Sequence, residues 1–133
     1  MSRTESSPYG SWAGQEPFEF VDGVHLNAFG GEQVLLCRVR YEPGKRVPRH
    51  AHADTEQVMA IVEGSVTMTI GDRTQELGVG DVVVVNRGIE HELVSEEGVT
   101  FFEALAPVPL DHVPDKERDL VLGPDGGAQH VEA

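Results

Sequence analysis

The chain has 133 residues, which suits one domain and leaves little room for a second. Ten lysines and arginines stand against 23 aspartates and glutamates, and the formal net charge of −13 repels nucleic acid and anionic lipid. The single cysteine, Cys37, excludes an intramolecular disulfide. No apolar run is long enough for a membrane span or a signal-peptide core. We therefore expect a cytoplasmic protein without nucleic-acid or membrane partners.

The predicted elements are short strands separated by turn signals. Residues 1–17 are rich in Ser, Gly and Pro without any periodicity, so a flexible arm is expected there. Strand signals follow at 33–41, 58–62, 65–70, 73–77, 82–85, 91–95 and 99–106. Gly71-Asp72 is a two-residue hairpin signal between the third and fourth of these strands. Four consecutive valines at 82–85 are typical of a strand that is buried on both faces.

The segment 18–106 shows no long helical period, and its strand spacing predicts an all-β sandwich or barrel. After Ala106 the composition shifts to prolines and charges, so residues 107–133 are expected to form a C-terminal extension and tail. Within it, residues 115–120 are compatible with one or two helical turns.

Three of the six histidines lie where strand signals meet turn signals. His50 and His52 are two residues apart in an extended segment, so their side chains point the same way and can share one ion. His91, from a neighbouring strand, can complete one face of the coordination sphere. Imidazole suits divalent transition metals. Taken alone, the pair at 50 and 52 is a weak signal and is more typical of two surface histidines in a loop.

The longer pattern around these histidines is more specific. It reads G-x5-H-x-H-x4-Q-x6-G from Gly44 to Gly64 and, after 15 residues, G-x5-N-x-G-x2-H from Gly80 to His91. This resembles the two motifs of the cupin superfamily, although Asn86 stands where the second motif usually has Pro, and Ser95 where it usually has Asn. The resemblance implies an all-β cupin double-stranded β-helix (jelly-roll) barrel, one bound Zn, Fe, Mn, Ni or Co ion, and a homodimer.

The resemblance implies His50, His52 and His91 as metal ligands, together with one neighbouring amide or carboxylate. Adjacent strand residues point to opposite faces, so only one of Glu56 and Gln57 can reach the ion. We predict Gln57, which satisfies the motif spacing on both sides. A Gln here also resembles the small cupins of the pectin-degradation and uronate-processing type. Glu56 remains the alternative ligand.

Further residues are candidates for the wall of a substrate cavity, namely Arg38, Arg40, Met59, Ile61, Phe101 and Phe102. The two arginines can hold a carboxylate at a barrel mouth, or can instead be exposed or form an inter-subunit salt bridge. Only one of Phe101 and Phe102 can face inward, because they are adjacent on a strand. No residue is matched to a catalytic role. The remaining histidines match neither motif and are expected at the surface or in hydrogen bonds: His25, His112 and His130.

These features predict a metal-dependent enzyme acting on a small molecule. The leading hypothesis is a divalent metal used as Lewis acid in cyclisation, isomerisation or lyase chemistry. The segment 101–115 also resembles small cupins associated with aromatic-polyketide assembly, some of which are cyclases. One alternative is an iron-dependent dioxygenase, which a carboxylate ligand would favour. Another is a non-catalytic metal- or ligand-binding module, which a closed cavity would favour.

Overall fold

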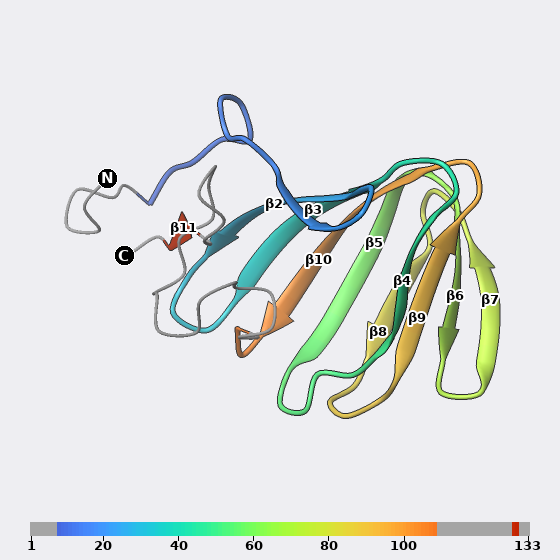
Figure 1. The fold of residues 1–133 in the computed structure, drawn as a ribbon. Coiled ribbons are helices and arrows are strands. Elements are labelled where there is room, and N and C mark those ends of the chain that lie inside the picture. Colours follow the sequence, from blue (N-terminus) through green and yellow to red (C-terminus); the bar gives the residue numbers. More distant parts are fainter. Residues whose placement is uncertain (1–7, 109–128, 131–133) are drawn as a thin grey trace.

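The computed structural model describes residues 8–108 and the short strand at 129–130 (Figure 1). The segment 115–120 and His112 lie outside the described residues. Among the described residues there is no helix long and apolar enough to cross a membrane. The strands are β1 (Phe18–Val21), β2 (Val24–Gly30), β3 (Leu35–Tyr41), β4 (Lys45–His50), β5 (Glu56–Gly64), β6 (Val66–Ile70), β7 (Arg73–Leu77), β8 (Val82–Val85), β9 (His91–Ser95), β10 (Val99–Ala106) and β11 (Gln129–His130).

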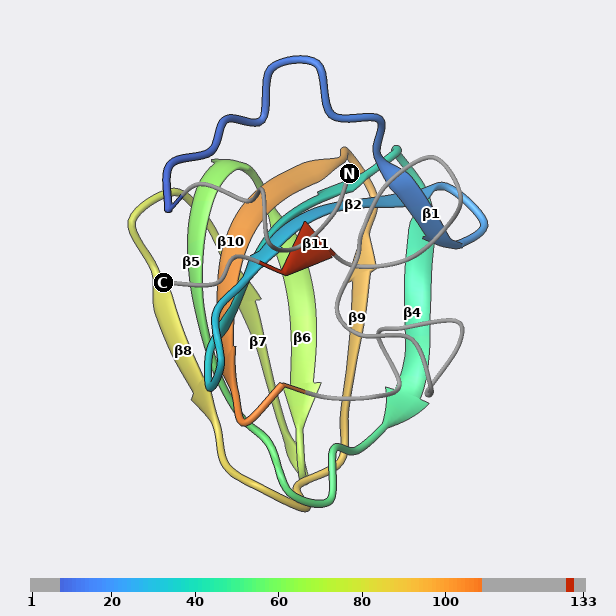
Figure 2. The same cartoon turned by 90° about the vertical axis from the view of Figure 1, so that its left-hand side faces the viewer.

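The strands form two sheets that face each other. One has the order β1-β2-β3-β10-β5-β8, with β11 pairing alongside β2, and the other has the order β4-β9-β6-β7. Figure 2 looks into the space between them, with β5 and β10 on one side and β4 and β9 on the other. Except for the parallel pairing of β11 with β2, every strand pairing is antiparallel. The predicted all-β jelly-roll class is therefore confirmed.

Alternation along the strands decides which side chains reach the core. In β3 every second residue from Leu35 to Tyr41 is buried, and the residues between them are exposed. The opposing strand β9 buries Leu93 in the same way. The inward-facing apolar residues of both sheets thus build one core between the sheets.

Glycines occupy turns between the strands, as the sequence predicts. The predicted hairpin across Gly71-Asp72 is confirmed, because Ile70 pairs with Arg73 and Gly71 has a positive φ of 62°. The strands β2 and β4 were not singled out in the sequence. β4, with the sequence Lys-Arg-Val-Pro-Arg-His, has Val47 as its one buried residue, and so it carries almost no strand pattern.

One expectation about burial is wrong. The valines of β8 were predicted to be buried on both faces, but Val82 is 65% exposed and Val84 is 53% exposed, whereas Val85 is buried. The reason is topological. β8 is the last strand of its sheet, and its outward side chains face away from the second sheet.

Candidate metal centre

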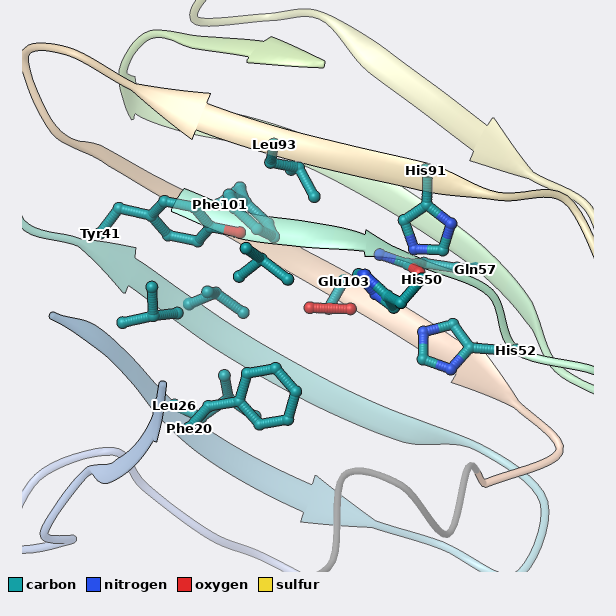
Figure 3. Close-up of a pocket in the computed structure, with 13 residues that line it drawn as sticks. Phe20, Leu26, Tyr41, His50, His52, Gln57, His91, Leu93, Phe101 and Glu103 are labelled. Carbon is teal, nitrogen blue, oxygen red and sulfur yellow. The ribbon is translucent and has the colours of Figure 1, made fainter. Parts of the chain in front are cut away.

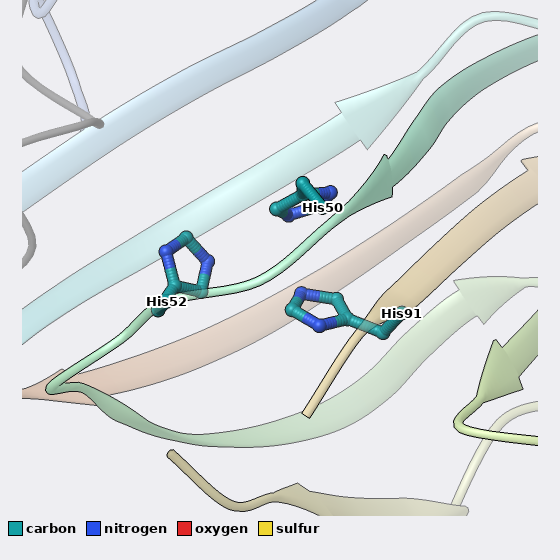
Figure 4. Close-up of side chains that lie close together, drawn as sticks. All are labelled: His50, His52 and His91. Carbon is teal, nitrogen blue, oxygen red and sulfur yellow. The ribbon is translucent and has the colours of Figure 1, made fainter. Parts of the chain in front are cut away.

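Three histidine side chains converge at one end of the space between the sheets (Figure 4). His50 ends β4 and is the register partner of His91, which begins β9. His52 follows two residues later, and its backbone carbonyl accepts a 2.8 Å hydrogen bond from the Gly88 amide. One ring nitrogen of each histidine lies within 4.8 Å of those of the other two. Strand pairing and one backbone hydrogen bond therefore bring the two sequence motifs together.

Local hydrogen bonds orient two of the rings. His50 Nδ1 donates to the Pro48 carbonyl at 2.8 Å, and His91 Nδ1 donates to the Ile89 carbonyl at 3.0 Å. A carbonyl oxygen only accepts, so Nδ1 carries the proton in both rings. The Nε2 atom of a neutral ring then keeps its lone pair, which is the tautomer that a metal ligand needs.

Gln57 adds a side-chain amide to the lining of the cavity that the three histidines share. Its side chain is 4% exposed and has a buried Oε1 atom with no hydrogen-bond partner. A buried amide oxygen without a partner is costly, and a cation beside it would satisfy it. Glu56 is exposed, because it lies on the other face of β5. Three imidazoles and this orphaned oxygen thus fit a divalent transition metal ion.

The cavity around these donors is small (Figure 3). Its volume is about 20 Å³, which is room for one ion or one water molecule and little else. Of the three histidines only His50 is partly exposed, so solvent reaches the centre past His50. The apolar part of the wall consists of Phe20, Val24, Leu26, Val39, Val47, Leu93 and Phe101.

Sequence reasoning missed Glu103, a carboxylate that projects into this cavity (Figure 3). Glu103 lies on β10 and is 5% exposed. Burial raises the pKa of the Tyr41 hydroxyl on the neighbouring strand, and the Glu103 carboxylate raises it further. Burial and then Glu103 raise the pKa of the Cys37 thiol in the same way. The alternation of strand residues could have pointed to Glu103, because residues two apart lie on the same face and Phe101 was a candidate for the cavity wall.

Of the other residues predicted to line the cavity, one does so, two lie in the core, and three lie on the outer face of the sheet. Phe101 lines the cavity, and Tyr41 does so as well without having been predicted. Met59 and Ile61 are buried in the core on the same face as Gln57, but they do not line the cavity. The remaining three candidates instead lie on the outer face of the sheet, because the alternate residues of β3 and β10 point inward: Arg38, Arg40 and Phe102.

A second group of possible ligands lies on the outside of the molecule and consists of Glu19, His25 and Glu42. His25 Nε2 and Glu42 Oε2 are 2.7 Å apart. The hydrogen bond from His25 is the main reason why the pKa of Glu42 is lowered. His25 is therefore a hydrogen-bonded residue, and Glu19 accepts a 3.0 Å hydrogen bond from the Gly23 amide.

Comparisons with known proteins agree with this architecture. The sequence profile described as "Cupin domain" matches residues 37–103. No curated protein is similar enough in sequence to count as a relative. Similar solved structures include an RmlC-like cupin from Shewanella frigidimarina, with 21% identity, 81% of this chain and 97% of that chain covered, and a TM-score of 0.74. KdgF from Halomonas sp. has 16% identity, coverage of 80% and 98%, and a TM-score of 0.74.

A third similar structure is described as a sugar phosphate isomerase from a cupin superfamily, from Silicibacter pomeroyi. It has 20% identity, coverage of 77% of both chains, and a TM-score of 0.67. At these identities the structural likeness concerns the fold alone.

Proposed function

Because the chain belongs to the cupin family, we propose that it is a metal-dependent enzyme for cyclisation, isomerisation or lyase chemistry on a small oxygenated substrate. The observation that carries the proposal is the content of one cavity. Three imidazoles and a neutral amide oxygen meet there, and the buried carboxylate of Glu103 faces the same space. A purely structural barrel has no need of a buried carboxylate, which is costly to desolvate.

The residues that would hold the ion are His50, His52, Gln57 and His91. When bound, a divalent ion supplies Lewis acidity towards substrate oxygens. All four ligating groups would be neutral, and the only carboxylate lining the cavity among the described residues is that of Glu103. The carboxylate oxygens of Glu103 are not part of the group of ligand atoms that lie within 4.8 Å of one another. We therefore assign Glu103 a role beside the ion and not as its ligand.

Glu103 is the proton acceptor that the sequence motifs do not name. A carboxylate oxygen at this position takes a proton from substrate carbon or hydroxyl as negative charge develops on the substrate oxygens. The Tyr41 hydroxyl, whose pKa is raised still further above neutrality, is protonated and would donate a hydrogen bond to the substrate. The apolar wall, with Phe101 and Leu93, excludes water from these groups.

The substrate class follows from the size of the cavity. The cavity has room for little beyond one ion, so a substrate would reach that ion with only a pair of oxygens, from the partly exposed side at His50. A keto-enol group offers such a pair of oxygens, together with an acidic proton. The proposal therefore includes keto-enol compounds of the aromatic-polyketide type, processed in the cytoplasm.

One observation favours a second candidate function. A cavity of about 20 Å³ also fits a non-catalytic module that binds a metal ion and at most a small anion. The dioxygenase alternative has less support, because among the described residues no carboxylate belongs to the histidine cluster.

The test combines metal substitution with a change at Glu103. The protein is prepared with Zn, Mn and Fe and assayed on keto-enol substrates with and without oxygen. We expect turnover with redox-inert Zn, and a loss of about 100-fold or more in kcat for Glu103→Gln at unchanged metal content. Glu76→Gln, an exposed change on β7, is the control. Turnover that requires both Fe and oxygen would support the dioxygenase instead, and absent turnover with tight anion binding would support the module.

A further inference from the structure

The cavity beside the three histidines is too small to hold the body of a substrate. Its volume is about 20 Å³, so one ion or one water molecule fills it. The residues that line it are all buried except two, His50 and Phe20, which are partly exposed. His50 is one of the proposed ligands. Phe20 is therefore the apolar side chain of the wall that already reaches solvent.

Phe20 lies on β1, the end strand of the larger sheet. Among the described strands, β1 pairs with β2 alone. The pairing passes from Glu19 directly to Val21, and their partners on β2 are consecutive residues. Phe20 is therefore the extra residue of a β-bulge. Bulges interrupt the ladder, and they redirect the side chain of the extra residue.

The bulge turns Phe20 into the space between the sheets. In Figure 3 its ring projects from β1 beside Leu26, on the side of the cavity away from Leu93 and His91. Phe20 and Val21 both pack against the core although they are adjacent in the strand, which regular alternation does not allow. The ring thus fills a space of its own size within the wall that the histidines share.

The backbone on the turn side of Phe20 is fixed to the strands that follow. The Glu42 amide donates a 2.9 Å hydrogen bond to the Gly23 carbonyl. Lys45 forms a 2.9 Å ion pair with Asp22 in the same turn. Because these contacts hold the β1–β2 turn, the side chain of Phe20 can rotate outwards while the strand stays paired.

We propose that Phe20 is the specificity-determining residue of this cavity. Its ring occupies the place of the substrate's body and rotates out to solvent when the substrate binds. The substrate class that fits is a planar six-membered ring with two adjacent oxygens, because its ring replaces that of Phe20 while its oxygens reach the ion. This inference rests on the proposed function and deepens it by naming the shape of the substrate.

The apolar wall explains how one class of ligand is selected. Moving Phe20 out of the cavity removes apolar area from contact with the core, and an entering ring beside Leu26, Leu93 and Phe101 restores that contact. A small anion cannot restore it, and therefore binds with Phe20 in place. The need to move Phe20 lowers the apparent affinity for ring-bearing ligands by the fraction of protein that is open.

The first test compares two ligands of different size on the cobalt-loaded protein. Azide needs one coordination position, whereas catechol brings a six-membered ring, and the visible bands of cobalt report the binding of each under nitrogen. We expect Phe20→Ala to lower the dissociation constant of catechol by about tenfold or more, because no ring has to move. The dissociation constant of azide should not change. Phe20→Trp, with its larger ring, should weaken catechol binding and leave azide binding unchanged.

Phe18→Ala is the matched control. Phe18 lies on the same strand and is also partly buried against the core, but it does not line the cavity. This variant should bind both ligands as the native protein does. A Phe20→Ala protein that binds catechol no more tightly than the native protein, or a Phe18→Ala protein that gains as much, overturns the proposal. Circular dichroism verifies that each variant is folded.

The second test needs no metal. The metal-free native protein and both alanine variants are titrated with benzene, and nuclear magnetic resonance follows the methyl groups of Val47 and Leu93, which line the cavity from the smaller sheet. We expect a saturable shift in Phe20→Ala, because an apolar space of this size binds benzene, and none in Phe18→Ala. The absence of that shift in Phe20→Ala overturns the proposal. If the native protein retains no cobalt, the proposed function fails, whereas this titration still decides the role of Phe20.

Discussion

Glu56 and Gln57 are sequence neighbours on β5, yet their environments differ completely. Gln57 turns its amide oxygen into the cavity, and Glu56 faces outward. We expect Gln57→Ala to lower metal affinity by roughly tenfold or more, because it removes one of four donors. Glu56→Ala should leave it unchanged. Elemental analysis after dialysis against a weak chelator provides the measurement. A Glu56→Ala protein that loses its metal, beside a Gln57→Ala protein that keeps it, would reverse the assignment.

At this scale the sequence identifies the three histidines that lie together, whereas only some of the predicted cavity-wall residues line the cavity. The spacing of His50 and His52 sets their direction, because side chains two residues apart on an extended segment share a face. Glu103 escaped notice because no motif contains it, and because Phe101 and Phe102 left open which face of β10 points inward. The inward face is set by pairing with β3 and β5, which is information from distant parts of the chain.

At the scale of elements, the turn between β5 and β6 shows why one motif position is glycine. Gly64 has a φ of +75°, and a Cβ atom there would meet the backbone carbonyl of Gly98. Gly71 also has a positive φ of +62°, but a Cβ atom there would meet nothing. Gly64→Ala therefore combines backbone strain with a clash that the neighbouring turn must absorb.

We expect Gly64→Ala to lower the free energy of unfolding by about 3 kcal/mol or more. Gly71→Ala, which has the strain without the clash, should cost about 1 kcal/mol. Urea denaturation of both variants measures the difference. Equal losses would show that the close approach of the Gly98 carbonyl has no energetic weight.

Strand positions could be predicted where apolar and polar residues alternate or where glycines mark the turns at the strand ends. The hairpin of β6 and β7 is the best case, and β4 is the worst, because its sequence of Lys, Arg and Pro carries no strand pattern. Strand β8 shows a different limit. Its valines predict burial on both faces, but a pattern of side chains does not show that β8 is the last strand of its sheet, with Val82 and Val84 exposed.

For the whole molecule, we expect the fold to form without the ion, and the ion to add to its stability when bound. The apolar core lies between the sheets and does not depend on the histidines. We expect the metal-free protein to stay folded, with a lower melting temperature. An ion at a hundred times its dissociation constant contributes about 2.7 kcal/mol.

Differential scanning calorimetry with and without chelator measures this effect. His91→Ala should melt at the same temperature in both conditions, because it no longer retains the ion. A native protein whose melting temperature ignores the chelator would contradict the assigned metal centre.

The register partnership of His50 and His91 also governs when the site can come into being during biosynthesis. About forty residues lie between the two histidines in the chain, so β4 is synthesised before β9. A nascent chain that displays His50 and His52 lacks the third imidazole and the strand that aligns it. An ion held by all three imidazoles can therefore bind only after β9 has been made and has paired with β4.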